Sequence, residues 1–241
     1  MSDLRDLLLE AHGGAQWKRY RRIHADMSIV GSLWARKGWP DALKNVHVEA
    51  DIANQQLSYR PFTAPDLRSF YSPNLVAIER VDDGTRLKER ANPRSSFEGH
   101  TPMTPWDDLQ LAYFSGYAMW NYLNTPFMFA LPGFVTEEIE PWSENGELWR
   151  RLKVSFPASV PTHSSVQVFH VGSEGLITRM DYFADVTGGV PTAHYMSDYR
   201  EFDGIKIPTK RRAHRRNEDN TPMANGLAVS IDISDVKLSE T

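Results

Sequence analysis

The sequence contains no cysteine, which excludes disulfide bonds, thiolate-bound zinc, iron–sulfur clusters and a cysteine nucleophile. Its formal net charge of −4 argues against nucleic acid as the main partner, because phosphate contacts dominate that affinity. The first residues carry acids where a signal peptide needs positive charge, and their apolar run is only three leucines. We therefore expect a cytoplasmic protein.

Several catalytic and cofactor signatures are also missing. The sequence has no GxSxG elbow, no phosphate loop, no GxGxxG after a strand, no HExxH and no calcium loop. His47, Glu49 and Asp51 alternate along one predicted strand, but alternate residues on a strand lie ~7 Å apart, too far to surround one small ion. We predict neither a cofactor nor a metal site.

The patterns that are present favour one domain over residues 1–241. A leucine stripe predicts a short helix over 2–12, ended by two glycines. Strand-like runs follow over 22–90 and again over 149–238, and glycine or proline marks most of the turns between them. Many strands with short connections predict an up-and-down antiparallel sheet, which protects its edges by curling.

A helix is predicted between the two sets of strands, over 104–124. Thr104 fits the N-cap position, Pro105 the first helical position, and Asp107 brings negative charge to the positive end of the helix dipole. The segment is apolar or aromatic nearly all the way round, so it must be buried on every side. It is too short and too rich in tyrosine, asparagine and serine to span a membrane. The predicted fold is mainly β with helices (α+β): a curved antiparallel sheet that forms an open or half barrel around a buried central helix.

Aromatic side chains of this helix are candidates for the walls of a binding site. Tyr113, Tyr117 and Trp120 recur at three- and four-residue spacing and share one face, and Phe127 follows shortly after. Such residues most simply form a core. Tyrosine and tryptophan, however, need a partner for their polar atom when they are buried, which favours a semi-polar cavity.

A hairpin at residues 194–213 can be assigned face by face. Its Asp-Gly turn favours a two-residue loop and fixes the register, with Met196 opposite Arg211 and Asp198 opposite Thr209. The drier face, which we expect to point inward, includes His194, Asp198 and Arg211. These three could line a ligand cavity, or Asp198 and Arg211 could form a structural ion pair.

Two further sets of polar residues are open to more than one interpretation. His163 and His194 could meet in space as a general acid–base pair, because histidine titrates near neutrality. Arg179 and Asp181 share one strand face, and a surface ion pair is the default interpretation of such a pair.

The layout of an N-terminal helix, a long antiparallel sheet and a helix in its concavity resembles the half-barrel of the bacterial lipoprotein carriers LolA and LolB and of the violacein-pathway enzyme VioE. The stretch SDYREFDGIKIPTKRR is similar to the late hairpin of LolA-type proteins. The segments PRSSFEGH, TPWDDL and YFSGYAMWNYLNTPF also resemble a group of uncharacterised bacterial proteins. The resemblance implies a concave hydrophobic surface that can hold an apolar molecule, and no catalytic residue is carried over from VioE.

Our first hypothesis is a cytoplasmic protein that binds a hydrophobic or aromatic small molecule between sheet and helix. Its walls would be Tyr113, Tyr117, Trp120 and Phe127, with polar contacts from the 194–213 hairpin. The second is a cofactor-independent isomerase, cyclase or hydrolase that uses a histidine as acid or base. The third is a structural or interaction protein whose interior is simply filled. The sequence leaves the oligomeric state open.

Overall fold

A computed structural model describes residues 3–240 of the chain. Thirteen strands form one antiparallel sheet, and its strand order is β6-β5-β4-β3-β2-β1-β13-β12-β11-β10-β9-β8-β7. The strands are β1 (Arg22–Val30), β2 (Val46–Asp51), β3 (Gln56–Arg60), β4 (Leu67–Ser72), β5 (Leu75–Arg80), β6 (Arg86–Ala91), β7 (Val135–Glu144), β8 (Glu147–Ser155), β9 (Val166–Val171), β10 (Ile177–Ala184), β11 (Val190–Phe202), β12 (Ile205–Arg216) and β13 (Pro222–Ser239).

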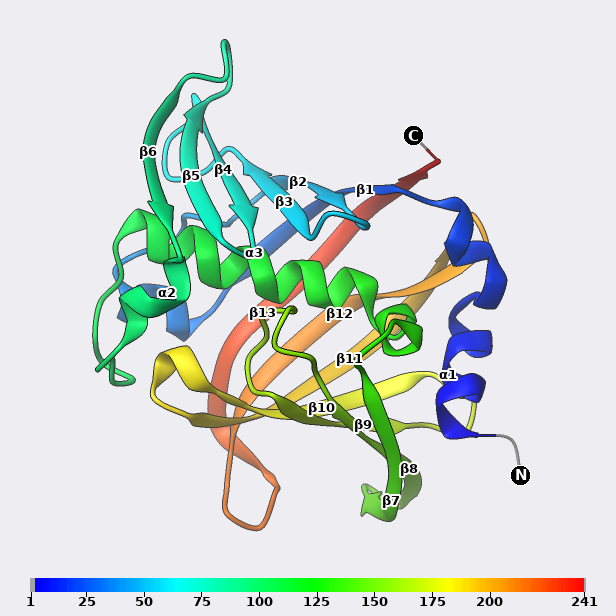
Figure 1. Cartoon of the computed structure of the whole chain (residues 1–241). Helices are drawn as coiled ribbons and strands as arrows, with labels where there is room; N and C mark the ends of the chain where they lie inside the picture. The colour runs from blue at the N-terminus through cyan, green and yellow to red at the C-terminus, as the bar shows by residue number, and fades with distance from the viewer. Residues whose placement is uncertain (1–2, 241) are drawn as a thin grey trace.

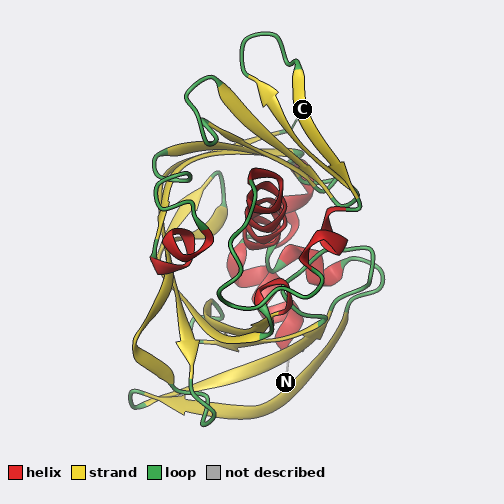
Figure 2. Cartoon of the chain, turned by 90° about the vertical axis from the view of Figure 1, so that its left-hand side faces the viewer, coloured by secondary structure: helices red, strands yellow, loops and turns green. Residues whose placement is uncertain are grey.

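The last strand joins the two halves of the sheet, because β13 lies between β1 and β12. The remaining strands pair with their neighbours in sequence, as expected for an up-and-down sheet. The two ends of the sheet, β6 and β7, do not pair, so the sheet is open. The sheet curves around the central helix, as the side view in Figure 2 shows. The predicted fold class is therefore confirmed.

The helical segments lie at the ends and inside this sheet. They are α1 (Leu4–His12), α2 (Ser32–Lys37), α3 (Asp108–Asn124) and the 3-10 turns η1 (Gly14–Arg19), η2 (Pro93–Phe97), η3 (Phe127–Ala130) and η4 (Asp185–Thr187). In Figure 1, α3 runs between the strands β2–β6 on one side and β9–β13 on the other.

The structure refines several predicted elements at the start and middle of the chain. The first helix begins at Leu4 with Asp3 as its N-cap, and the predicted start at residue 2 lies outside the described residues. The first strand was expected to run from Arg22 to Trp34, but it stops at Val30, because Gly31 turns the backbone at φ 137° and packs against the Ala228 carbonyl, and α2 follows. The edge strand β7 was missed, because its mostly exposed side chains give no buried alternation.

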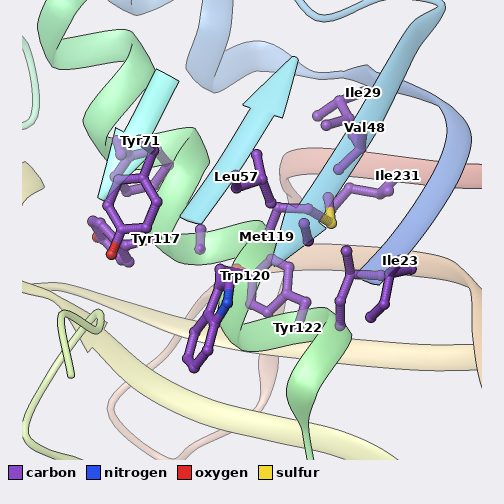
Figure 3. Close-up of a cluster of buried hydrophobic side chains, with 14 of the residues drawn as sticks. Ile23, Ile29, Val48, Leu57, Tyr71, Tyr117, Met119, Trp120, Tyr122 and Ile231 are labelled. Carbon is purple, nitrogen blue, oxygen red and sulfur yellow. The ribbon is translucent and has the colours of Figure 1, made fainter. Parts of the chain in front are cut away.

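The central helix is enclosed as predicted. Every residue from Leu109 to Asn124 is buried. Figure 3 shows the contacts around it: Met119 points toward Val48 and Ile231, whereas Trp120 points away from them. A helix with no exposed face takes its stability from packing, since an isolated helix of this length is marginal in water.

The start of the helix differs from the prediction. Asp107, and not Thr104, is the N-cap: its carboxylate accepts the Gln110 N–H at 2.8 Å, and the Gln110 side chain accepts the Asp107 N–H at 3.0 Å. This reciprocal pair satisfies two helix-end donors at once. Thr104 instead lies in the preceding loop, where its carbonyl accepts a hydrogen bond from Lys37.

The predicted hairpin register is confirmed, with Phe202 opposite Ile205, Met196 opposite Arg211 and His194 opposite Ala213. The expected orientation of Asp198 is wrong. Its backbone takes a left-handed φ of 59°, its side chain is exposed, and it pairs with Lys210 at 2.8 Å. A positive φ within a strand breaks the strict alternation of faces on which that expectation depended.

Gly116 lets α3 approach the sheet closely, because a Cβ there would lie 2.5 Å from both Cβ and Cγ of Tyr71. We predict that Gly116→Ala destabilises the fold by about 1–3 kcal/mol through overpacking, although alanine is the better helix former by about 1 kcal/mol. Urea unfolding would measure the change. Tyr71→Gly removes both atoms of this contact, so Gly116→Ala should cost less stability in a Tyr71→Gly background than in the parent. A Gly116→Ala variant as stable as the parent would contradict the close contact.

The cap of α3 generates a second prediction. Hydrogen bonds from Arg90 and the Gln110 backbone lower the pKa of Asp107, although partial burial opposes them. We predict that Asp107→Ala lowers the unfolding free energy by about 1 kcal/mol at neutral pH. Because a lowered folded-state pKa stabilises only above the unfolded carboxyl pKa, the difference between the two proteins should shrink as the pH falls below about 4. Asp107→Asn is the control: it keeps the cap oxygen, so it should stay close to the parent in stability at neutral pH.

Candidate functional site

Three hollows lie around α3, each against a different face of the helix. We call the first the slot: a cavity of about 60 Å³ between α3 and the sheet, with Phe114, Ala118, Met119, Ile29, Val229 and Ile231 among its walls. We call the second the groove: about 830 Å³ beside the C-terminal end of α3, with Trp17, Trp120, Phe127, Leu131, Phe134 and Val160 among its walls. The third, the polar hollow, measures about 690 Å³ and includes Asn74, Asn92, Arg94, Tyr113, Thr162 and Asp185.

The structure separates the predicted wall residues. Trp120 and Phe127 line the groove together, and Tyr113 lines the polar hollow. Tyr117 is fully buried between α3 and its neighbours, where its ring contacts Tyr113 and its hydroxyl approaches His163. Spacing along the helix placed these aromatic residues on one side of α3, but it could not show that different loops cover each of them.

A buried cluster of tyrosines surrounds His163. The Tyr117 hydroxyl lies 3.1 Å from Nδ1 of His163, and the Tyr122 hydroxyl lies 2.7 Å from Nε2. The ring of Tyr182 stacks on the imidazole with centroids 4.2 Å apart. A neutral imidazole has one N–H donor and one acceptor, so one of the two hydroxyls donates to the ring and the other accepts. The cluster thereby gives the buried Tyr117 hydroxyl the partner that a buried tyrosine needs.

The two predicted catalytic histidines are neighbours, joined through Tyr182. The Tyr182 hydroxyl lies 3.5 Å from Nδ1 of His194, while its ring covers His163. Burial, reinforced by Arg94, lowers the pKa of His163 to about 3, and burial together with Arg211 lowers the pKa of His194 well below its usual range. Both rings are therefore neutral at physiological pH. Neither histidine lines the slot, the groove or the polar hollow.

Arg211 lies beneath the C-terminal end of α3 and is buried. Its Nη2 donates to the Tyr122 carbonyl at 2.9 Å, and its guanidinium lies 4.8 Å from the centre of the Tyr122 ring. The last carbonyls of a helix lack partners and carry negative partial charge, so a cation here stabilises the helix end. Asp198 does not take part, because its side chain lies outside with Lys210.

A buried ionic network on the opposite face of β10 was missed. Arg179 is fully buried and donates to Asp181 at 2.7 Å, to Glu144 at 2.6 Å and to the Asn220 carbonyl at 2.6 Å. The default interpretation of Arg179 and Asp181 as a surface pair was therefore wrong. Burial alone would raise the pKa of Asp181, but hydrogen bonds from His170 and Arg179 outweigh it and lower that pKa. The β7–β8 hairpin and the turn after β12 cover Arg179 and Asp181. These segments meet β10 only in the folded chain.

Among residues 3–240, no group of three or more histidine, aspartate or glutamate side chains is placed to hold a metal ion. Within the same range, no helix combines the length and the apolar character needed to cross a membrane.

Comparisons with known proteins identify the architecture. No protein-family model matches the sequence, and no curated protein matches it. Among solved structures, a LolA superfamily protein from Nitrosomonas europaea is similar with a TM-score of 0.52 and 11% identity, over 96% of this chain and 91% of that one. A DUF1329 family protein from Desulfovibrio piger gives a TM-score of 0.52 and 14% identity, over 98% and 91% of the two chains.

A third structure, named as an outer membrane lipoprotein-sorting protein domain from Vibrio parahaemolyticus, is similar with a TM-score of 0.52 and 9% identity, over 97% of this chain and 91% of that one. Identities this low establish the shape of the backbone and leave the ligand open. The resemblance stated from the sequence is confirmed at the level of architecture: the chain has a LolA-like fold.

Proposed function

We propose that this protein binds a hydrophobic, lipid-like molecule in the groove. The observation that carries the proposal is the groove itself, about 830 Å³ of open space with mostly apolar walls. Pockets for small molecules typically measure about 300–1,000 Å³ and are lined mainly by hydrophobic and aromatic side chains. The slot is far smaller, and the polar hollow carries the Arg94–Asp185 ion pair and several amide and hydroxyl side chains beside its apolar ones, so the groove fits a bulky apolar ligand best.

The walls of the groove are rigid where a ligand would press against them. The rings of Trp17 and Phe127 stack with centroids 4.3 Å apart and an angle of 7° between their planes. Trp120 is fixed by a hydrogen bond of 2.9 Å from its indole nitrogen to the Asp51 carbonyl. A preorganised wall loses little conformational entropy when a ligand binds.

The groove also exposes apolar surface to water in the absence of a ligand. Leu131 follows η3 and leaves 52% of its surface accessible at the edge of the groove, and Phe134 packs partly exposed nearby. A concave patch of exposed apolar side chains typically marks a binding surface. The charged side chains Asp6, Glu10, Lys18 and Arg21 stand around the rim and include both signs, so the groove itself favours neither an acidic nor a basic ligand.

We predict that the uncharged fluorescent probe N-phenyl-1-naphthylamine binds in the groove. There it should quench tryptophan emission, because the tryptophans in the walls of the groove transfer excitation energy to the bound probe. Leu131→Arg removes apolar surface from the edge of the groove and brings in a hydrated cation, so it should weaken binding about tenfold, which corresponds to the loss of about 1–2 kcal/mol of apolar contact. Titration of probe fluorescence would measure the change.

The matched control is Leu87→Arg on the edge strand β6, where the parent leucine is 50% exposed and lies outside the groove. This variant should bind the probe as the parent does. Equal binding by the Leu131 and Leu87 variants, or no binding by the parent protein, would overturn the proposal.

A further inference from the structure

The slot differs from the groove in shape. It lies between the face of α3 that carries Phe114, Ala118 and Met119 and the strands β1, β12 and β13, and its volume is about 60 Å³. A cavity needs about 10–15 Å³ of such volume to hold one water molecule, so the slot has room for a short single row of small groups. An unbranched alkyl chain is about as thick as such a row, whereas a ring or a two-chain lipid is wider. The small volume of the slot therefore fits one unbranched chain better than a ring or a two-chain lipid.

Two arginines line the same cavity. Arg36 comes from the short helix α2 and Arg215 from the far end of β12. Among residues 3–240, neither forms an ion pair, and the Arg36 guanidinium makes a long hydrogen bond of 3.4 Å to the Ser32 hydroxyl. Arg215 is exposed and Arg36 is half-buried, so both guanidinium groups can be reached from the surface.

The cationic residues next to Arg36 and Arg215, in contrast, do have partners. Arg212 pairs with Asp232 at 2.6 Å and Arg216 with Asp181 at 3.1 Å, so cations close to Arg215 on the same strand have acidic partners. Lys37, next to Arg36, turns inward and donates to three backbone carbonyls. Arg36 and Arg215 thus keep guanidinium donors available where the slot meets the surface.

From this geometry we infer that the slot binds a single-chain anionic amphiphile of the fatty-acid type. The unbranched tail lies along the apolar walls between α3 and the sheet, and the carboxylate binds Arg36 and Arg215 at the mouth. Guanidinium groups match a carboxylate with two parallel hydrogen bonds, and such charge-assisted bonds are stronger than neutral ones. This site shares no lining residue with the groove, and unlike the groove it has only cations among its charged side chains, which favours an anion.

The test is isothermal titration of the full-length protein with decanoate, decanol, decyltrimethylammonium and acetate, each below its micelle concentration. Decanoate should bind, decanol and the cation at least about tenfold more weakly, and acetate not measurably, because the tail and the charge are both needed. Arg36→Gln and Arg215→Gln should each weaken decanoate binding about tenfold.

Two control variants distinguish binding in the slot from binding elsewhere on the protein. Arg200→Gln removes an arginine on β11 that does not line the slot, and Leu131→Arg alters the groove, so both should bind decanoate as the parent protein does. Equal affinity for decanoate and decanol, unchanged binding in the Arg36 and Arg215 variants, or no binding of decanoate would overturn the inference. Loss of decanoate binding in Leu131→Arg would place the chain in the groove and overturn it as well. Thermal unfolding of each variant confirms that the fold is intact.

Discussion

The structure depends on one constraint: α3 is apolar on every side and must be enclosed on every side. A single flat layer can cover one face of a helix, so enclosure requires a sheet that curves around it. The thirteen-stranded sheet does this by bringing β3–β5 to one side of the helix and β10–β13 to the other. Gly116 shows how closely the layers meet, because the ring of Tyr71 occupies the space that any larger residue would need.

Enclosing such a helix also encloses its polar atoms, and the fold satisfies most of them locally. Hydroxyls of Tyr117 and Tyr122 reach the two nitrogens of His163, and Arg211 reaches a carbonyl at the end of α3. A buried polar group without a partner costs about 1–3 kcal/mol, so these contacts decide whether the interior is tolerable. The low pKa of His163 is a consequence of this packing, since the charged ring would have no compensating anion nearby.

The same packing explains why hollows lie between α3 and the elements that surround it. Different faces of α3 meet different partners: the sheet at Met119, the N-terminal segment at Trp120 and the loops before β9 at Tyr113. Surfaces of such different shape do not match everywhere, and each mismatch leaves a space with its own lining. The slot is small and mostly apolar with Arg36 and Arg215 among its lining residues, the groove is larger and has aromatic walls, and the polar hollow carries the Arg94–Asp185 pair.

The sequence alone determined the local features: the apolar helix, the Asp-Gly turn with its register, and the alternating strands that predict an open antiparallel sheet. Each is set by contacts between residues close in the chain. It could not place Asp198, whose positive φ turns its side chain outward, or reveal that the β7–β8 hairpin buries Arg179. The distribution of Tyr113, Tyr117, Trp120 and Phe127 over separate environments was likewise decided by tertiary structure. Residues far apart in sequence cover each face of α3, and periodicity along one helix carries no information about what packs against it.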